Sequence, residues 1–224
     1  MDGRCKDFDY IININITDRV HLVAKIVNLH KSTIKTTPKI YTKTGDKGTS
    51  ALYTGERRPK SDPIFEALGS TDELSCTIGL ANEFATENGH TFTEQLENIQ
   101  CRLQELGSCI ATPTNSANTK KIEKVKFSSN HALNLETWID EMTKELPPLR
   151  NFILPSGGKT SSCLHLARTK CRAAERRLVT VAQDGNIDQN AVIYLNRLSD
   201  YLFTVARFAA KREGKPEKIY KQNV

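Results

Sequence analysis

The sequence predicts an all-α protein, a five-helix antiparallel bundle with an N-terminal extension. Five segments place apolar residues three and four positions apart, which is the spacing of the buried face of a helix. Most connections between these segments are short and contain Gly or Pro, and short connections favour antiparallel neighbours. Neither half of the 224-residue chain alternates apolar and polar residues as half-buried strands do. We therefore expect one helical domain over residues 39–221, preceded by an extension of residues 1–38.

The first two helices are defined by their end signals. Asp62-Pro63 is a capping residue followed by Pro at the first helical position, and the helix that it opens runs to Asn88-Gly89. Thr91 and Glu94 have the spacing of a capping box and are expected to open the second helix. That helix ends where a polar loop, residues 113–128, begins.

The last three helices follow from periodicity and from the residues that stop them. The third carries His131, Leu135, Trp138 and Met142 and ends before Pro147-Pro148. The fourth carries its apolar stripe over residues 164–181 and closes at Asp184-Gly185. The fifth begins near Asp188 and continues up to Gly214.

The N-terminal extension has a divided composition. Residues 1–18 carry four Asp against one Arg and one Lys, whereas residues 19–39 carry five basic residues and no acidic one. A basic, hydroxyl-rich segment without acids is typical of an organellar transit peptide, but an acidic start is not. A transit segment and a disordered tail therefore both remain open interpretations.

Composition excludes several classes of protein. The 32 Lys and Arg exceed the 26 Asp and Glu by a formal charge of +6, which favours an anionic ligand without indicating nucleic acid. No apolar stretch approaches the roughly 18 residues that a membrane span needs. The six Cys form no CxxC pair and the five His show no ligand spacing, so we expect buried free thiols and no metal held by protein side chains.

Residues 40–60 form a polar loop with the composition of a phosphate site. Glycines let backbone N–H groups turn toward an anion, and hydroxyls and lysines add donors and positive charge. No GxxxxGK[ST] pattern fits, so the loop is not a Walker A motif. The sequence thus predicts a phosphate-binding loop, with an ordinary turn-rich surface loop as the alternative. Its candidate residues are Thr42, Lys43, Thr44, Gly45, Lys47, Gly48, Thr49, Ser50 and Lys60.

The fourth helix carries a row of charged residues. Arg168, Arg172 and Glu175 stand at i, i+4 and i+7, which places them within roughly 60° of one another around the helix. The row borders the apolar stripe of the same helix. A solvated face with weak ion pairs is the alternative to a binding site. Further polar candidates on the neighbouring helices are Asp72, Asn196 and Asp200.

Four long segments, in this order, carry a resemblance to a known family: KIYTKTGDKGTSALYTGERRPKSD, EALGSTDELSCTIGLA, RNFILPSGGKTSSCLHLARTKCRAAERR and YLNRLSDYLFTVARFAA. They resemble the PduO-type ATP:cob(I)alamin adenosyltransferases over about residues 39–221. The GERRPK and NRLSDYLFT stretches are more similar to the animal mitochondrial members than to the bacterial ones. The resemblance implies a transferase (EC 2.5.1 type) that moves the 5′-deoxyadenosyl group of ATP to cob(I)alamin and releases triphosphate.

The resemblance also implies roles for individual residues. Phe152 is similar to the aromatic residue that shields the lower face of the corrin, and Asp72 to an acid that pairs with the arginine matching Arg168. Family members usually have two adjacent arginines where this chain has Arg172-Ala173, which puts one polyphosphate or interface contact in doubt. Mg²⁺ would be held mainly by the ATP phosphates. The implied ATP-binding set is Thr42, Lys43, Thr44, Gly45, Ser50, Ala51, Lys60, Arg172, Ala173, Ala174, Glu175, Arg176 and Asn196. The implied catalytic set is Asp72, Phe152, Arg168 and Arg172, and the cobalamin side comprises Phe152, Asp72, Arg168 and Asp200.

The family's assembly and partners follow from the same resemblance. Its members are trimers of five-helix bundles with sites between subunits, so a homotrimer is expected, with a cobalamin reductase and methylmalonyl-CoA mutase as possible protein partners. Neither nucleic acid nor a membrane is expected as a partner. The mitochondrial matrix is the expected location, with the cytoplasm as the alternative.

Two other classes of function compete with this interpretation. A non-catalytic helical module could bind polyphosphate or nucleic acid through its basic surface, but the carboxylates of Asp72, Glu175 and Asp200 would repel a phosphate backbone. A kinase-like phosphoryl transferase is disfavoured because the Walker A and kinase motifs are missing.

Overall fold

The computed structural model describes residues 39–183 and 185–221, and this part of the chain is mostly helical. The predicted extension, residues 1–38, lies outside the described residues, as does Asp184. Five long helices occur at the predicted places, and a short sixth lies in the loop that was expected to have no helix. The helices are α2 (Pro63–Glu87), α3 (Thr93–Ile110), α4 (Thr119–Lys124), α5 (Asn130–Glu145), α6 (Gly158–Ala182) and α7 (Gln189–Arg212).

Two antiparallel pairs of short strands accompany the helices. β1 (Thr49–Ala51) pairs with β2 (Arg57–Pro59) inside the polar loop before α2. β3 (Ile153–Leu154) pairs with β4 (Lys218–Ile219), which joins the segment before α6 to the segment after α7. Strands of two or three residues are too short to leave a clear periodicity in a sequence.

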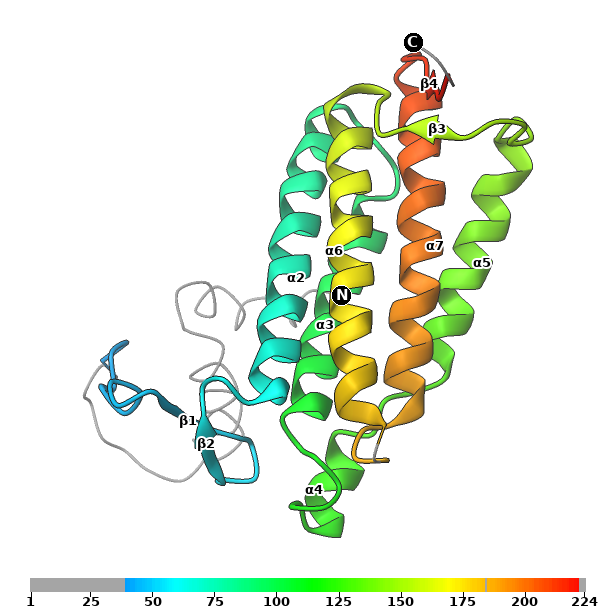
Figure 1. Ribbon diagram of the computed structural model, residues 1–224. Coiled ribbons are helices and arrows are strands. Elements are labelled where there is room, and N and C mark those ends of the chain that lie inside the picture. The colour runs from blue at the N-terminus through cyan, green and yellow to red at the C-terminus, as the bar shows by residue number, and fades with distance from the viewer. Residues whose placement is uncertain (1–38, 184, 222–224) are drawn as a thin grey trace, which may run out of the picture.

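The long helices lie side by side along one axis (Figure 1). α2 packs against α3 and α6, α6 packs against α7, and α7 packs against α5. Helices that follow each other in the chain alternate in direction, so α5 and α7, which are separated by α6, run parallel. The β1–β2 hairpin lies at one end of this arrangement and β3–β4 at the other (Figure 1).

The core is built from the predicted apolar stripes. Leu74 and Ile78 of α2, Leu103 of α3, Leu164 of α6 and Leu198 of α7 are at most 1% exposed. Burying a side chain of this size stabilises the fold by about 1.5–3 kcal/mol. In the described part of the chain, no helix is long and apolar enough to cross a membrane.

Helix ends follow the sequence signals with one exception. The Asp62 carboxylate accepts from the Ile64 N–H at 2.9 Å with Pro following it, and the Asp188 carboxylate accepts from Asn190 N–H at 3.0 Å, as predicted. The predicted capping box at Thr91 and Glu94 is wrong. α3 begins at Thr93 without a side-chain cap, because the preceding Phe92 is buried and its packing sets the start of the helix.

No disulfide bond is found among the described cysteines. Cys109 and Cys171 are buried, as expected, but Cys76 and Cys101 are exposed. Each lies on the outer side of its helix, so the expectation of burial is wrong for these two.

A buried hydrogen-bonded pair of side chains closes the end of the bundle that carries β3 and β4. His90 Nε2, just after α2, lies 3.0 Å from Glu213 Oε1, just after α7, and both side chains are less than a tenth exposed. Burial alone would raise the pKa of the Glu213 carboxyl, but hydrogen bonds from His90, Lys215 and Thr160 outweigh it and lower that pKa to about 2. The charged carboxylate is therefore the form that this end of the fold stabilises.

Replacing Glu213 by Gln should reduce stability. Because the folded pKa is depressed, the carboxylate stabilises the fold above the unfolded pKa of about 4.3, and this contribution disappears as the pH falls toward 2. Glu213→Gln should therefore lower the free energy of unfolding at pH 7 by about 1–3 kcal/mol, measured by urea denaturation. The variant should also lose less stability than the wild type between pH 5 and pH 2, by roughly the same amount.

Glu145→Gln is the matched control, since Glu145 pairs with Arg212 at 2.8 Å at the same end of the bundle but both side chains are about half exposed. We expect a change below about 0.5 kcal/mol for this variant. Equal effects of the two substitutions would contradict the importance of the buried pair.

Candidate functional site

The polar loop before α2 has a fixed turn at its centre. Lys43 adopts a left-handed backbone conformation, with φ 55°, and Gly48 another, with φ 73°. The Gly48 N–H donates to the Gly45 carbonyl at 3.1 Å, and the hydroxyls of Thr42 and Thr44 lie 2.9 Å apart. The loop thus gathers hydroxyl groups and a close backbone turn in one short stretch.

Lys60 returns to this turn from the far end of the hairpin. Its N–H donates to the Gly48 carbonyl at 2.9 Å. Its ammonium lies so close to Gly45 that a Cβ built on that glycine would be 3.2 Å from Nζ. Glycine at position 45 therefore lets the lysine charge approach the backbone of the turn. Ser50 is buried in β1, and Ala51 beside it is half-buried.

Arg57 holds the loop together and was not singled out as a site residue. Its Nη2 donates to the Thr44 carbonyl at 2.6 Å, the Thr49 carbonyl at 3.2 Å and the Thr49 hydroxyl at 2.7 Å. Arg58, its neighbour, instead pairs with Glu56 at 2.7 Å and Asp62 at 3.5 Å. The sequence shows two adjacent arginines, but only the structure distinguishes their partners.

The loop is anchored on the helices behind it. Leu52 is 1% exposed in the core, and the Tyr53 N–H donates to the Ala111 carbonyl after α3 at 3.0 Å. Lys121 of α4 donates to the carbonyls of Tyr53 and Thr54 at 3.3 and 3.2 Å, with its ammonium 5.5 Å from the Tyr53 ring centroid. The short helix α4, which the sequence did not reveal, thus supports the loop.

The charged row of α6 lies beside α7. Glu175 accepts from the Asn196 side chain at 2.8 Å, so two predicted residues from different helices meet. Arg172 and Arg176 are exposed, and the Arg176 guanidinium donates to the Arg172 carbonyl at 3.1 Å. Ala174, also predicted to contact the nucleotide, is 1% exposed in the core.

Ala173 is half-buried next to this row. Position 173 usually holds an arginine in the family that the sequence resembles. With Ala173 there, the charged row of this chain offers two exposed guanidinium groups, those of Arg172 and Arg176.

Arg168 lies one turn closer to the start of α6. Its guanidinium carbon is 5.9 Å from the ring centroid of Phe203 on α7, and its Nε is buried with no hydrogen-bond partner among the described residues. Asp72 is half-buried on α2, the helix that packs against α6. The ion pair between Asp72 and Arg168 stays a prediction. Asp200 pairs with Arg197 on its own helix at 3.0 Å.

His165 was not identified from the sequence as a site residue. It is 3% exposed, one turn before Arg168, and its ring lies 5.9 Å from that of Phe203. Burial, together with the Arg168 charge, lowers the pKa of the His165 imidazole to about 4. The ring is therefore neutral at pH 7, which leaves Arg168 as the positive charge of this pair of side chains.

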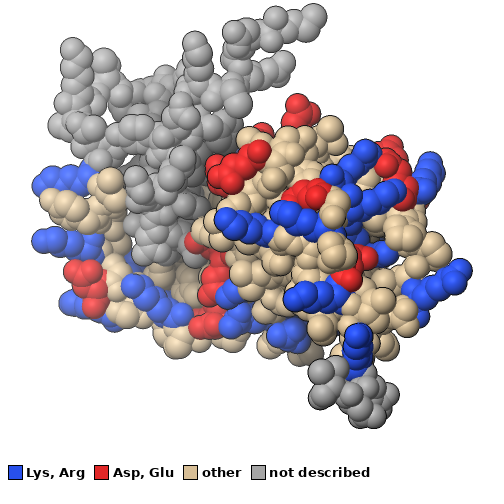
Figure 2. Space-filling view, turned by 90° about the horizontal axis from the view of Figure 1, so that it is seen from above, with Lys and Arg blue, Asp and Glu red and all other residues tan. Residues whose placement is uncertain are grey.

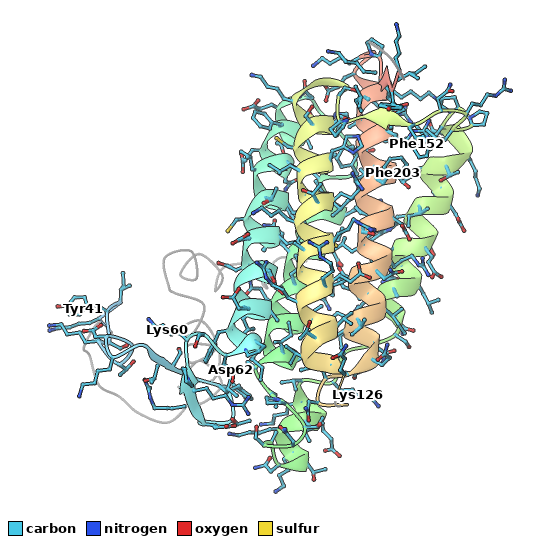
Figure 3. The ribbon with its side chains drawn as sticks, in the orientation of Figure 1. Tyr41, Lys60, Asp62, Lys126, Phe152 and Phe203 are labelled. Carbon is cyan, nitrogen blue, oxygen red and sulfur yellow. The ribbon has the colours of Figure 1, made fainter. Side chains whose placement is uncertain are left out.

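Phe152 is 84% exposed in the connection between α5 and α6. Figure 3 shows Phe152 and Phe203 toward one end of the helices, with Tyr41 and Lys60 on the far side of α2 toward the other end. The structure thus does not bring the polar loop and Phe152 together within one chain. No group of three or more His, Cys, Asp and Glu side chains that could hold a metal is found among the described residues.

Comparison with known proteins identifies the family. The family model of cobalamin adenosyltransferases matches residues 40–209. This chain belongs to the cobalamin adenosyltransferase family. The match spans the polar loop, the charged row of α6 and most of α7.

Curated relatives of this adenosyltransferase family come from animals and bacteria. Corrinoid adenosyltransferase MMAB of Mus musculus is 58% identical over 192 residues, covering 86% of this chain and 81% of the relative. MMAB of Homo sapiens is 59% identical over 186 residues, or 83% of this chain and 74% of the relative. A corrinoid adenosyltransferase of Bacillus subtilis is 43% identical over 179 residues, covering 79% and 89%.

Solved structures of the family share the fold. A variant PduO-type ATP:corrinoid adenosyltransferase from Lactobacillus reuteri, complexed with cobalamin and ATP, superposes with a TM-score of 0.76 at 36% identity, covering 82% of this chain and all of that one. A second variant of that enzyme, complexed with ATP, gives a TM-score of 0.74 at 36% identity, covering 81% and 100%. The resemblance to PduO-type enzymes and to the animal members is therefore confirmed.

Arg57 should rigidify the loop of this adenosyltransferase. Removing three hydrogen bonds from a charged donor in Arg57→Ala should speed amide exchange at Gly48 and Lys60 by roughly tenfold. Arg58→Ala serves as the matched control, because Glu56 and Asp62, the partners of Arg58, lie outside the turn. Hydrogen exchange read by mass spectrometry tests this, and equal exchange rates in the two variants would contradict the role of Arg57.

Proposed function

We propose that this protein transfers the 5′-deoxyadenosyl group of ATP to cob(I)alamin, giving adenosylcobalamin and triphosphate. The observation that carries the proposal is the Lys60 ammonium lying against Gly45 in a loop of hydroxyls and turned backbone, in a chain of the cobalamin adenosyltransferase family. Such a loop suits a polyanion and needs no metal ligand of its own. The solved relative complexed with both cobalamin and ATP supports the choice of substrates.

The loop forms the polyphosphate part of the proposed ATP site. Lys60 and Lys43 supply positive charge, and backbone and hydroxyl groups at the turn supply neutral donors. Arg57 and Arg58 are occupied by the loop itself and by acidic neighbours, so the lysines are the cations that can approach phosphate. The nucleotide residues of the loop are Thr42, Lys43, Thr44, Gly45, Ser50, Ala51 and Lys60.

The charged row of α6 forms the other part of the ATP site. Exposed Arg172 and Arg176 bring positive charge to the triphosphate, and Glu175, oriented by Asn196, is placed to accept hydrogen bonds from the nucleoside. Ala173 lies between these side chains and contributes contact area only, whereas Ala174 behind it is buried in the core. A site with fewer arginines than usual at this position depends more strongly on Arg172.

The two parts belong to different copies of the chain in the proposed assembly. The polar loop lies on the far side of α2 from α7, whereas α6 with its charged row lies between α2 and α7 (Figure 1). Large apolar side chains also face outward from the helices α2, α6 and α7, which favours self-association. These are Leu80, Leu166, Val179 and Ile193, each between 40% and 49% exposed. A homotrimer with sites between subunits is the arrangement we propose.

The reaction requires the protein to align the two substrates and to stabilise the leaving group. Cobalt(I) is already a strong nucleophile, so the protein need not activate a side chain but must align the cobalt with the 5′-carbon of ATP. The C5′–O bond breaks as the Co–C bond forms, and the electron pair leaves with triphosphate. Lys60 and Arg172 stabilise that leaving group. Mg²⁺, held mainly by the ATP phosphates in this proposal, would neutralise phosphate oxygens.

The cobalamin side of the site centres on Phe152. An exposed aromatic ring can cover the lower face of the corrin and exclude both the axial ligand and water, which leaves a four-coordinate cobalt(II) that is easier to reduce. Asp72 and Arg168 position this end of α6 through their proposed ion pair. Asp200 lies one helical turn from Asn196 and adds a carboxylate to the polar side chains on the cobalamin side of the proposed site.

The remaining proposals rest on likeness to the animal members. A cobalamin reductase would supply the reduced substrate, and methylmalonyl-CoA mutase would accept the product. The mitochondrial matrix is the proposed location, with the cytoplasm as the alternative.

Arg172→Ala and Lys60→Ala should each lower kcat/KM for ATP by roughly ten- to a thousandfold, since each removes a charge beside the polyphosphate. The measurement is an anaerobic assay of adenosylcobalamin and triphosphate with chemically reduced cobalamin. Arg177→Ala is the control on α6, where Arg177 lies 3.6 Å from exposed Glu66. Wild-type kinetics in both site variants would refute the site, and an absence of product in the wild type would refute the reaction.

Asp72→Asn and Arg168→Ala should impair formation of four-coordinate cobalt(II) more than ATP affinity. Breaking a fully buried pair from one side can cost about 3–5 kcal/mol, and this half-buried pair should cost less. Magnetic circular dichroism of cob(II)alamin with ATP measures the first quantity and calorimetric titration the second. An unchanged four-coordinate signal in both variants would show that the pair does not act on the cobalt.

A further inference from the structure

The segment after α7, residues 214–221, returns onto the connection that carries Phe152. We call it the C-terminal segment. Its strand β4 pairs with β3, and the Tyr220 N–H donates to the carbonyl of Phe152 itself at 2.8 Å. The Lys218 N–H donates to the Ser156 hydroxyl at 2.8 Å. The C-terminal segment therefore bonds to the backbone on which Phe152 stands.

Side-chain packing contributes little to holding the C-terminal segment against the connection that carries Phe152. Phe152 is 84% exposed, and in the C-terminal segment Ile219 and Tyr220 are 51% and 54% exposed. Exposed two-residue strands are not stable by themselves. A further interaction must hold the C-terminal segment against the bundle.

Arg207 supplies that interaction. It is 8% exposed on α7, and its Nε donates to the two carboxylate oxygens of Glu217 at 3.0 and 3.4 Å. Its Nη2 donates to the Pro147 carbonyl at 3.1 Å. Pro147 begins the connection that leads to Phe152, and Glu217 directly precedes β4. One buried guanidinium thus binds both the start of that connection and the strand that pairs with its end.

We propose that Arg207 and Glu217 are positioning residues for Phe152. The inference rests on the proposed function of Phe152 at the lower face of the corrin. Without Glu217, the Arg207 charge stays buried without its carboxylate, and the C-terminal segment loses its charged contact with α7. The Phe152 carbonyl then loses a fixed donor, and the ring no longer keeps one position over the cobalt. Neither residue contacts the reacting atoms.

The distribution of charges on the surface near the C-terminal segment indicates that loss of the Glu217 charge would act locally. Seen from above, basic and acidic side chains are interspersed over the described part of this face, with no field of one sign (Figure 2). Arg212 pairs with Glu145 at 2.8 Å and Lys215 with Glu213 at 2.8 Å. Loss of the Glu217 charge should therefore act through the C-terminal segment and not through a change in long-range attraction of a ligand.

Glu217→Gln is the central variant, because it removes the charge and keeps the shape. We expect amide exchange at Tyr220 and Lys218 to become roughly tenfold faster. With cob(II)alamin and ATP, the four-coordinate signal should fall several-fold, while ATP affinity changes by less than about twofold. Glu217→Asp, which keeps the carboxylate, should recover part of the signal.

The double variant separates positioning from general destabilisation. If Glu217 acts through Phe152, adding Glu217→Gln to Phe152→Ala should produce no further loss of the four-coordinate signal. Glu145→Gln is the control, since it breaks an exposed pair at the same end of α7 without touching the C-terminal segment. It should leave both the exchange at Tyr220 and the signal unchanged.

Three results would overturn the inference: wild-type exchange at Tyr220 in Glu217→Gln, additive losses in the double variant, or an unchanged signal in Phe152→Ala. The last result would leave the adenosyl transfer itself intact, because product formation from chemically reduced cobalamin is measured separately. Absence of product in the wild type would instead refute the proposed function.

Discussion

The packing of α6 between α2 and α7 is the constraint on which the rest of the structure depends. Ala167, Cys171 and Ala174 are at most 1% exposed along the buried face, and these small side chains let α7 approach closely. The Cys171 thiol donates to the Leu195 carbonyl at 3.2 Å, which further fixes the two helices. Because Arg168 and Arg172 each follow a buried residue of this face by one position, their placement at its edge is determined by the core.

Cations of two kinds occur in the protein. Arg57, Arg58 and Arg207 each make several hydrogen bonds or ion-pair contacts, and they hold loops and segments in place. Lys60, Arg172 and Arg176 make no ion pair among the described residues, so their charges remain available to a ligand. Planar guanidinium groups suit fixed bridges between carbonyls and carboxylates, whereas a lysine can move toward a phosphate as a point charge.

The sequence could predict the features that are set by interactions between residues close together in the chain. Apolar spacing and local caps such as Asp62 and Asp188 predicted the long helices, because those signals act within a few residues. The capping box at Thr91 failed because burial of Phe92, a tertiary contact, outweighed a local hydrogen bond. The pairing of β3 with β4 joins segments on either side of α6 and α7, and no local pattern encodes it.

The candidate site was predictable to a similar extent. The resemblance supplied the residue types, and the structure brings two of them, Glu175 and Asn196, into contact, while their role toward the nucleotide stays a prediction. Helical spacing could not reveal that His165 would be buried and neutral beside Arg168, or which of two adjacent arginines would bond the loop. Such properties arise from desolvation and from partners that are distant in the chain.

The dimensions of α6 link these features to the proposed assembly. A helix of 25 residues is about 37 Å long, and the polar loop and Phe152 lie toward opposite ends of the bundle (Figure 1). Cobalt and the 5′-carbon of ATP must nevertheless approach to about 3.5 Å before reaction. Within one chain the polar loop and Phe152 lie toward opposite ends (Figure 1), which supports the proposal that a second copy contributes its loop to the site. In that proposal the loop of the second copy lies beside Arg168 and Arg172 on α6.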